Sequence, residues 1–238
     1  MKLDILAIGA HPDDVELGCG ATIAKEIANE KKIGIIDLTR GELGTRGTAE
    51  TRDEESKNAA NILGVHLRVN MNFADGFFVN DKKHQLEVIK MIRKYQPEIV
   101  LCNAIDDRHI DHGKGSNLVS DACFLSGLIK VETKENNDIQ KPWRPKQVYH
   151  YIQWKNLEPD FTVDVTGFMD KKMESVLAYK TQFYDATSKA PETPISSKNF
   201  TDSIKYRARD LGRLVGVEYA EGFNVERYAA VDSLFDLK

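Results

Sequence analysis

The stretch Ile8-Gly9-Ala10-His11-Pro12-Asp13-Asp14-Val15-Glu16-Leu17 follows an apolar run at residues 3–8. The run is typical of a buried strand, and the residues after the stretch are typical of a helix. Open α/β sheets bind ligands at the edge where strands give way to helices, so these polar residues are predicted to lie at that edge. His11 and one aspartate suit metal ligation there, with the other aspartate as a base. The alternative is that Asp13 or Asp14 only caps the helix, with His11 a bystander.

A second polar cluster, Asp106-Asp107-Arg108-His109-Ile110-Asp111-His112-Gly113, follows another apolar run at residues 98–104. The carboxyl ends of parallel strands share one sheet edge, so we expect the two clusters to meet. His109 and His112 are three residues apart and would lie near one face of a first helical turn. A His, Asp and His set with open positions for water is what a catalytic zinc-type site requires.

Strand-like and helix-like segments alternate along the 238 residues. This order predicts an α/β, Rossmann-like, doubly wound and mostly parallel sheet with helices on both faces. The length suits a single domain over 1–238, with an N-terminal core to about residue 130 and a C-terminal part from about residue 147 that completes the site. We expect strands at 3–8, 33–39, 66–73, 98–104, 148–153 and 161–165, and helices at 18–29, 48–63, 85–95, 112–125, 169–183 and 202–215. Residues 133–146 are expected to be a loop, and 186–199 a lid or an interface arm.

The composition bounds the partners of the chain. The net charge is −4 and both signs are mixed throughout, which favours neither nucleic acid nor a membrane as partner. No segment has the length of a membrane span, and the strand that begins after one Lys leaves no room for a signal peptide. Three widely spaced cysteines, of which Cys19 is expected in the core, suit reduced thiols in a cytoplasmic protein. A dinucleotide site is disfavoured, because the turn after the first strand contains Gly9 alone and lacks the GxGxxG spacing of such sites.

The two motifs Ala-His-Pro-Asp-Asp-Val-Glu and Arg-His-Ile-Asp-His resemble the signature pair of the LmbE-like (PIG-L type) metal-dependent N-deacetylases. The resemblance implies that His11, Asp14 and His112 hold one divalent metal. Two histidines and one aspartate suit Zn²⁺, which we expect, and Fe²⁺, which is the alternative. A bound metal lowers the pKa of a water molecule toward ~7 and polarises an amide carbonyl. Asp13 is then the general base that accepts the proton of this water.

The same resemblance assigns roles to two further residues of the second cluster. His109 matches the family's non-ligand histidine, which stabilises the oxyanion and protonates the leaving amine. Asp111 would orient His109 or His112, as carboxylates commonly do for such histidines. The alternative for Asp111 is a helix N-cap.

Several other segments, among them Thr39-Arg40-Gly41-Glu42 and Tyr219-Ala220-Glu221-Gly222-Phe223, look most like the bacillithiol-biosynthesis branch of that family. This likeness implies N-acetylglucosaminyl-malate as the substrate and a homohexamer as the assembly. The carboxylates of malate need cationic partners, and guanidinium matches them best. The candidates for substrate binding are Arg46, Arg52, Arg108 and Arg144. Of these, Arg144 is the one expected to approach Asp13 and keep it ionised.

Three other functions remain open. The first is an enzyme of the same kind that acts on a different N-acetyl amino sugar, such as N-acetylglucosamine or a chito-oligosaccharide. A non-catalytic ligand-binding module of the same fold would lack Asp13 or His109, yet both are present. A metal-dependent phosphoesterase would usually carry two metals and more carboxylates than the two clusters supply.

Overall fold

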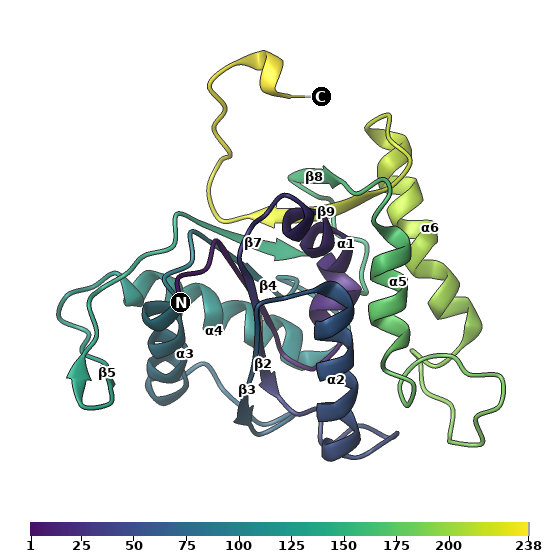
Figure 1. Ribbon diagram of the computed structural model, residues 1–238, viewed down its shortest axis with the longest axis horizontal. Coiled ribbons are helices and arrows are strands. Elements are labelled where there is room, and N and C mark those ends of the chain that lie inside the picture. Colours follow the sequence, from purple (N-terminus) through teal and green to yellow (C-terminus); the bar gives the residue numbers. More distant parts are fainter. Residues whose placement is uncertain (238) are drawn as a thin grey trace.

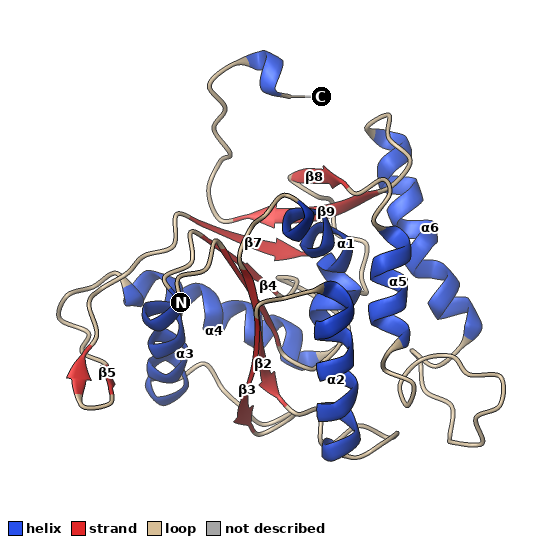
Figure 2. Cartoon of the chain, in the orientation of Figure 1, coloured by secondary structure: helices blue, strands red, loops and turns tan. Residues whose placement is uncertain are grey.

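A seven-stranded sheet forms the centre of the computed structural model, which describes residues 1–237 (Figure 1). The strands are β1 (Ile5–Gly9), β2 (Ile33–Thr39), β3 (Leu67–Phe73), β4 (Ile99–Cys102), β7 (Gln147–Tyr151), β8 (Phe161–Asp164) and β9 (Ala220–Val225), in the order β3-β2-β1-β4-β7-β9-β8. The helices are α1 (Asp14–Ala28), α2 (Ala49–Leu63), α3 (Lys82–Tyr95), α4 (Ile110–Ser126), α5 (Met169–Leu177) and α6 (Lys198–Leu214), followed by a 3₁₀ turn η1 (Leu234–Asp236). The predicted mostly parallel α/β sheet with helices on both faces is confirmed (Figure 2).

Side chains of β1 alternate between two apolar layers. Leu6 and Ile8 pack in the layer that contains α3 and α4, whereas Ile5 and Ala7 pack in the layer that contains α1. All of these side chains are buried because helices cover both faces of the sheet. A strand buried on both faces has a continuous apolar sequence, which is why the run at residues 3–8 identifies it.

The C-terminal part of the chain extends the same sheet. Strand β7 pairs in parallel with β4, and β9 then pairs antiparallel with both β7 and β8. Helix α5 packs against α1 and α2, and α6 packs against β9 (Figure 1). Segments more than 100 residues apart in the sequence therefore share one face with the start of the chain.

Helix α1 is kinked at Cys19, whose backbone dihedrals of −142° and 22° are not helical. Beyond the kink, the amides of Ala21 and Thr22 donate to the Glu221 carboxylate at 3.2 and 2.7 Å. Lys172 Nζ lies 2.6 Å from Glu221 Oε1, and both side chains are buried. Glu221 thus supplies acceptors for amides at the start of the second helical segment, and Lys172 balances its charge.

Several elements differ from the sequence-based expectations; α3 and α6, for example, begin at Lys82 and Lys198 instead of residues 85 and 202. Helix α1 begins at Asp14, four residues before the expected start at residue 18. Helix α5 ends at Leu177 instead of residue 183, because the following turn brings Thr181 onto Glu55 through two hydrogen bonds. The expected loop at residues 133–146 contains a short hairpin of β5 (Lys134–Glu135) and β6 (Asp138–Ile139). Its turn residues Asn136 and Asn137 have the positive φ values that tight hairpins use.

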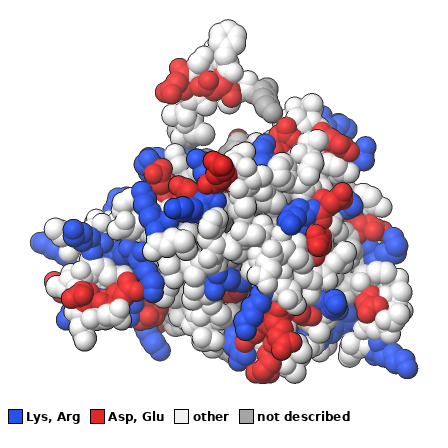
Figure 3. All heavy atoms as spheres, viewed as in Figure 1, with Lys and Arg blue, Asp and Glu red and all other residues white. Residues whose placement is uncertain are grey.

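Figure 3 shows acidic and basic side chains intermixed over the visible face of the molecule. After β9 the chain leaves the body of the fold and ends in η1 (Figure 1). Within residues 1–237, no helix combines the length and the hydrophobicity that a transmembrane segment needs.

Candidate active site

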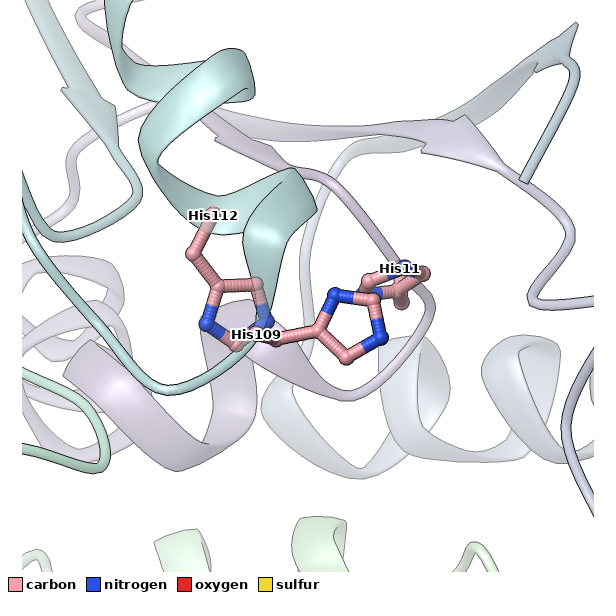
Figure 4. Close-up of side chains that lie close together, drawn as sticks. All are labelled: His11, His109 and His112. Carbon is pink, nitrogen blue, oxygen red and sulfur yellow. The ribbon is translucent and has the colours of Figure 1, made fainter. Parts of the chain in front are cut away.

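The two polar clusters meet where β1 and β4 end. His11 follows β1, whereas His109 and His112 lie at the start of α4, and the three rings face one another (Figure 4). The ring centroid of His11 is 4.5 Å from that of His109 and 5.5 Å from that of His112. Ring nitrogens of the three histidines all lie within 4.8 Å of one another. The predicted meeting of the clusters at one sheet edge is therefore what the structure shows.

His11 is held by carboxylates at both ring nitrogens. Its Nδ1 lies 3.5 Å from Asp14 Oδ2, and its Nε2 lies 3.0 Å from Asp75 Oδ1 and 3.5 Å from Asp111 Oδ2. Burial opposes the charged imidazolium, but these three carboxylates outweigh it and hold the pKa of His11 well above its usual value. The expectation that Asp111 orients His109 or His112 is wrong in this geometry, since Asp111 faces His11 instead.

His112 is held in the same manner. Its Nε2 lies 3.2 Å from Asp14 Oδ1, and its Nδ1 lies 2.7 Å from Asp107 Oδ2. Burial lowers the pKa of His112, yet Asp14 and Asp107 together raise it to about 9. His11 and His112 therefore both face Asp14 with one nitrogen and an orienting carboxylate with the other, which is the usual arrangement around metal-binding histidines.

Asp14 is fixed between these two rings by neutral donors. Its Oδ2 accepts hydrogen bonds from the His11 amide and from Asn103 Nδ2, both at 2.9 Å. Its Oδ1 accepts from Gln153 Nε2 at 2.6 Å. Burial would raise the pKa of Asp14, but the cationic His112 and His11 hold it well below its usual value. A carboxylate between two protonated histidines marks a place where a bound cation would displace two protons.

This donor set fits a divalent metal. His11, Asp14 and His112 converge with buried side chains and orienting partners, and a metal held by them would compensate the Asp14 charge in place of the two protons. Two other sets of side chains also converge, His11 with His109 and His112, and His11 with Asp75 and Asp111, and both share His11. The carboxylates of the second set are also engaged by other donors, Asp75 by the Leu43 amide and Asp111 by Lys114 Nζ and the Gly76 amide.

Asp13 has an unusual backbone and a charged partner. Its φ of 111° lies where side chains are rarely found, and it holds the N-cap position of α1 without making a capping bond. Its Oδ2 instead accepts a hydrogen bond from Arg52 Nη2 at 3.1 Å, and the same guanidinium donates to the Pro12 carbonyl. Burial raises the pKa of Asp13 to about 7, although Arg52 opposes the rise. The helix-capping alternative therefore does not describe this side chain.

His109 occupies the N-cap position of α4, which the alternative interpretation had given to Asp111. Its Nδ1 accepts a hydrogen bond from the Asp111 amide at 3.3 Å, which leaves the proton of the neutral ring on Nε2. Burial lowers the pKa of His109, and the neighbouring His11 and His112 lower it further. His109 is therefore a neutral donor at neutral pH.

The four candidate arginines lie in different surroundings. Arg52 is the one that contacts Asp13. Arg46 is buried and donates to the carbonyls of Pro191 and Ala190, so it ties the expected lid segment to the loop after β2. Arg108 lies over the Trp154 ring, 4.6 Å from its centroid.

The expectation that Arg144 approaches Asp13 is wrong. Its Nη2 donates to the Phe124 carbonyl at 2.8 Å, and its guanidinium lies 4.5 Å from the Phe124 ring centroid. This is the C-terminal end of α4, whereas the site lies at the helix start. Arg144 precedes β7, which runs parallel to β4, so it lies at the amino edge of the sheet, opposite the edge where the two polar clusters meet.

A cleft of about 450 Å³ opens above these residues. One wall is the His and Asp cluster, and the opposite wall comes from the C-terminal part of the chain. The lining residues from that part include Gln153, Trp154, Lys172, Thr193, Pro194, Phe200, Arg207 and Glu221. The size is typical of small-molecule sites.

Several residues of the site were not foreseen from the sequence. Asp107 lies inside the second cluster, and Asp75 lies in the turn after β3, so both follow strands that end at this edge. Asn103 immediately follows β4 and gives the same signal. Gln153 follows β7, which is parallel to β4, and gives the same signal. Arg207 gives no such signal, because it lies on α6 and reaches the site only through the folding of the C-terminal part.

Comparisons with known proteins agree with this geometry. The PIG-L family, described as GlcNAc-PI de-N-acetylase, matches residues 6–123, which contain both motifs. A crystal structure of the conserved protein TT1542 from Thermus thermophilus is similar over 97% of this chain and 98% of that one, with 34% identity and a TM-score of 0.86. The chain belongs to the PIG-L family of sugar de-N-acetylases, which are hydrolases.

Two curated relatives are informative. The uncharacterized deacetylase YaiS of Escherichia coli K12 is 44% identical over 114 residues, which are 45% of this chain and 61% of YaiS. The diacetylchitobiose deacetylase of Thermococcus kodakarensis is 28% identical over 228 residues, which are 92% of this chain and 81% of that protein.

Proposed function

We propose that this protein is a metal-dependent hydrolase that removes the N-acetyl group from a substrate containing N-acetylglucosamine. The observation that carries the proposal is Asp14 facing two carboxylate-oriented histidines, with Asp13 and its Arg52 partner beside it in the same cleft. The substrate that we favour is N-acetylglucosaminyl-malate, as in bacillithiol biosynthesis, on the resemblance of the segments quoted above. The same resemblance supports a cytoplasmic homohexamer.

In this proposal His11, Asp14 and His112 hold one divalent metal, with Zn²⁺ favoured and Fe²⁺ as the alternative. A metal bound there would acidify a water molecule and polarise the amide carbonyl of the substrate. Asp107 and Asp111 keep the two ligand imidazoles in position through His112 Nδ1 and His11 Nε2.

Asp13 is the general base of the proposed reaction. Its carboxylate accepts the proton of the attacking water, and a pKa of about 7 suits this exchange at neutral pH. The proton is then available to the leaving nitrogen. His109 donates its Nε2 proton in a hydrogen bond to the carbonyl oxygen as negative charge develops there, since its Nδ1 is already an acceptor.

A second substrate is favoured by a specific comparison. The relative from Thermococcus kodakarensis that aligns with 92% of this chain is a diacetylchitobiose deacetylase. N-acetylglucosamine or a chito-oligosaccharide is therefore the alternative substrate for this protein.

A substrate panel tests both versions. Purified protein, stripped of metal and reloaded separately with Zn²⁺ and Fe²⁺, is offered N-acetylglucosaminyl-malate, N-acetylglucosamine and diacetylchitobiose, and acetate release is measured. We expect metal-dependent release that is fastest from the malate glycoside. Fastest release from diacetylchitobiose would select the alternative substrate. No release from any of the three with either metal would contradict the proposed function.

A further inference from the structure

The cleft contains cations whose charge no carboxylate neutralises. Among its described lining residues, Arg52 pairs with Asp13 and Lys172 pairs with Glu221, so their charges are compensated within the protein. The two other cations that line the cleft are Arg108 and Arg207, and neither guanidinium forms an ion pair within residues 1–237.

Both of these arginines contact Trp154. Arg108, in the loop just before α4, lies over the indole ring. Arg207, on α6, donates from Nη2 to the Trp154 carbonyl at 2.5 Å and from Nε to Asn156 Oδ1 at 3.2 Å. Its Nη1 makes no hydrogen bond within residues 1–237, and the side chain is partly buried. The two arginines come from distant parts of the chain and meet at one side of the cleft.

Asp107, the acidic group that acts on Arg207, is already engaged by other donors. Asp107 attracts Arg207 electrostatically, but its Oδ2 accepts hydrogen bonds from His112 Nδ1 at 2.7 Å and the Trp154 amide at 3.2 Å. Its Oδ1 accepts from the Lys155 and Arg108 amides. Burial of an arginine without a counterion is unfavourable, which is why burial lowers the pKa of Arg207. A site of this kind is suited to an anionic ligand.

We propose that Arg207 and Arg108 form an anion subsite beside Trp154, which binds a carboxylate of the substrate's aglycone. The inference deepens the proposed function by assigning carboxylate recognition to Arg207, a residue of the C-terminal part. Guanidinium groups pair well with carboxylates and can donate two parallel hydrogen bonds to them. The hydrogen bonds of Nε and Nη2 fix the plane of the Arg207 guanidinium, and its free Nη1 is the donor left for the ligand. A neutral amino sugar would leave the partly buried Arg207 without a counterion.

The first test compares two forms of one substrate. In the dimethyl ester of N-acetylglucosaminyl-malate, two methyl groups replace the negative charges of the carboxylates, and kcat/KM is measured for both compounds. Arg207→Gln should lower kcat/KM for the diacid by roughly 10-fold or more, the range for a lost charged hydrogen bond, and change the ester little. Arg207→Lys should keep most of the preference for the diacid. Arg209→Gln is the matched control. Arg209 lies on the same helix two residues after Arg207, but it is exposed and contacts Tyr219.

Equal losses for the diacid and the ester in Arg207→Gln would overturn the proposal, since they would mean that Arg207 only holds the segment around Trp154. Unchanged kinetics for both would overturn it as well. A higher kcat/KM of the wild-type enzyme for the ester than for the diacid would also overturn the proposal.

A binding measurement separates this inference from the proposed function. In a Trp143→Phe background, Trp154 is the remaining tryptophan, and its fluorescence is titrated with L-malate or with the uncharged malamide. We expect a saturable change with malate that malamide does not give and that Arg207→Gln abolishes. This result would support the anion subsite even if no acetate were released from any substrate. Equal responses of wild type and Arg207→Gln to malate, or none in either, would overturn it.

Discussion

Asp13 combines features that ordinary helix-capping residues lack. It has a positive φ, its side chain is buried, and its carboxylate contacts a buried arginine. Strained backbone persists where the surrounding structure enforces it, and such positions cluster at functional sites. The Arg52 guanidinium also donates to the Pro12 carbonyl and lies 5.7 Å from the Tyr179 ring centroid, so its position is fixed on two further sides. We infer that Arg52 sets both the place and the acidity of Asp13.

Arg52→Met should shift the pH dependence of turnover. A base acts only when ionised, so the wild-type rate should fall as pH drops through the pKa of Asp13, which is about 7. Because Arg52 lowers that pKa, its removal should raise it and move the acidic limb of the profile to higher pH. The measurement is kcat/KM against pH with the metal present in both enzymes. Arg40→Met is the control, since Arg40 pairs with Asp53 away from Asp13. An acidic limb that stays in place or moves to lower pH would contradict this role.

Helix α1 links the active site to the C-terminal part through its kink. Tyr151 on β7 is fully buried, donates to the Ile8 carbonyl at 3.1 Å and lies directly against Gly18. A Cβ atom on Gly18 would lie 2.1 Å from Tyr151 Cδ2, so a side chain cannot be accommodated without movement of the ring or of the helix. The glycine at this position is therefore required by close packing.

Two alanine substitutions in α1 should have different effects on stability. Gly18→Ala should lower the free energy of unfolding by about 1–3 kcal/mol, the usual cost of overpacking. Gly20→Ala places its Cβ 3.4 Å from Lys172 Cγ, an ordinary contact, and should leave stability unchanged or raise it slightly. Urea unfolding of both variants measures the difference. Equal stabilities of the two variants would show that the Tyr151 ring yields at little cost.

The molecule as a whole is joined by buried charges as well as by the sheet. Lys172 on α5 and Glu221 on β9 form an ion pair that also receives two amides of α1. Arg68 similarly connects Asp37 on β2 with Glu16 on α1, and Glu16 accepts a hydrogen bond from Tyr179. These contacts join the C-terminal part to the elements that carry His11 and Asp13. They hold the two walls of the cleft in a fixed relation.

Lys172→Met should destabilise the whole fold. Removal of one partner from a buried ion pair leaves an uncompensated charge and typically costs about 3–5 kcal/mol. Lys205→Met is the control, because Lys205 pairs with Asp170 at the surface, where ion pairs contribute little. Chemical denaturation of both variants decides the outcome. A Lys172→Met variant as stable as the control would mean that the amides of Ala21 and Thr22 suffice to stabilise Glu221.

The sequence by itself determined the order of strands and helices and the edge at which the polar residues gather. Strand β2 matches its predicted range of 33–39, because a strand buried on both faces has a distinct apolar pattern. The two motifs follow β1 and β4 directly, so parallel topology alone brings His11 near His112. Local periodicity and chain direction are sufficient for both results.

Only the tertiary structure decided which side chains contact one another. Arg52, not Arg144, reaches Asp13, and Asp111 faces His11. The antiparallel β9 and the wall that carries Arg207 depend on packing between distant segments. Partner choice among several arginines and carboxylates depends on side-chain direction and burial in three dimensions, and the spacing of residues along the chain encodes neither.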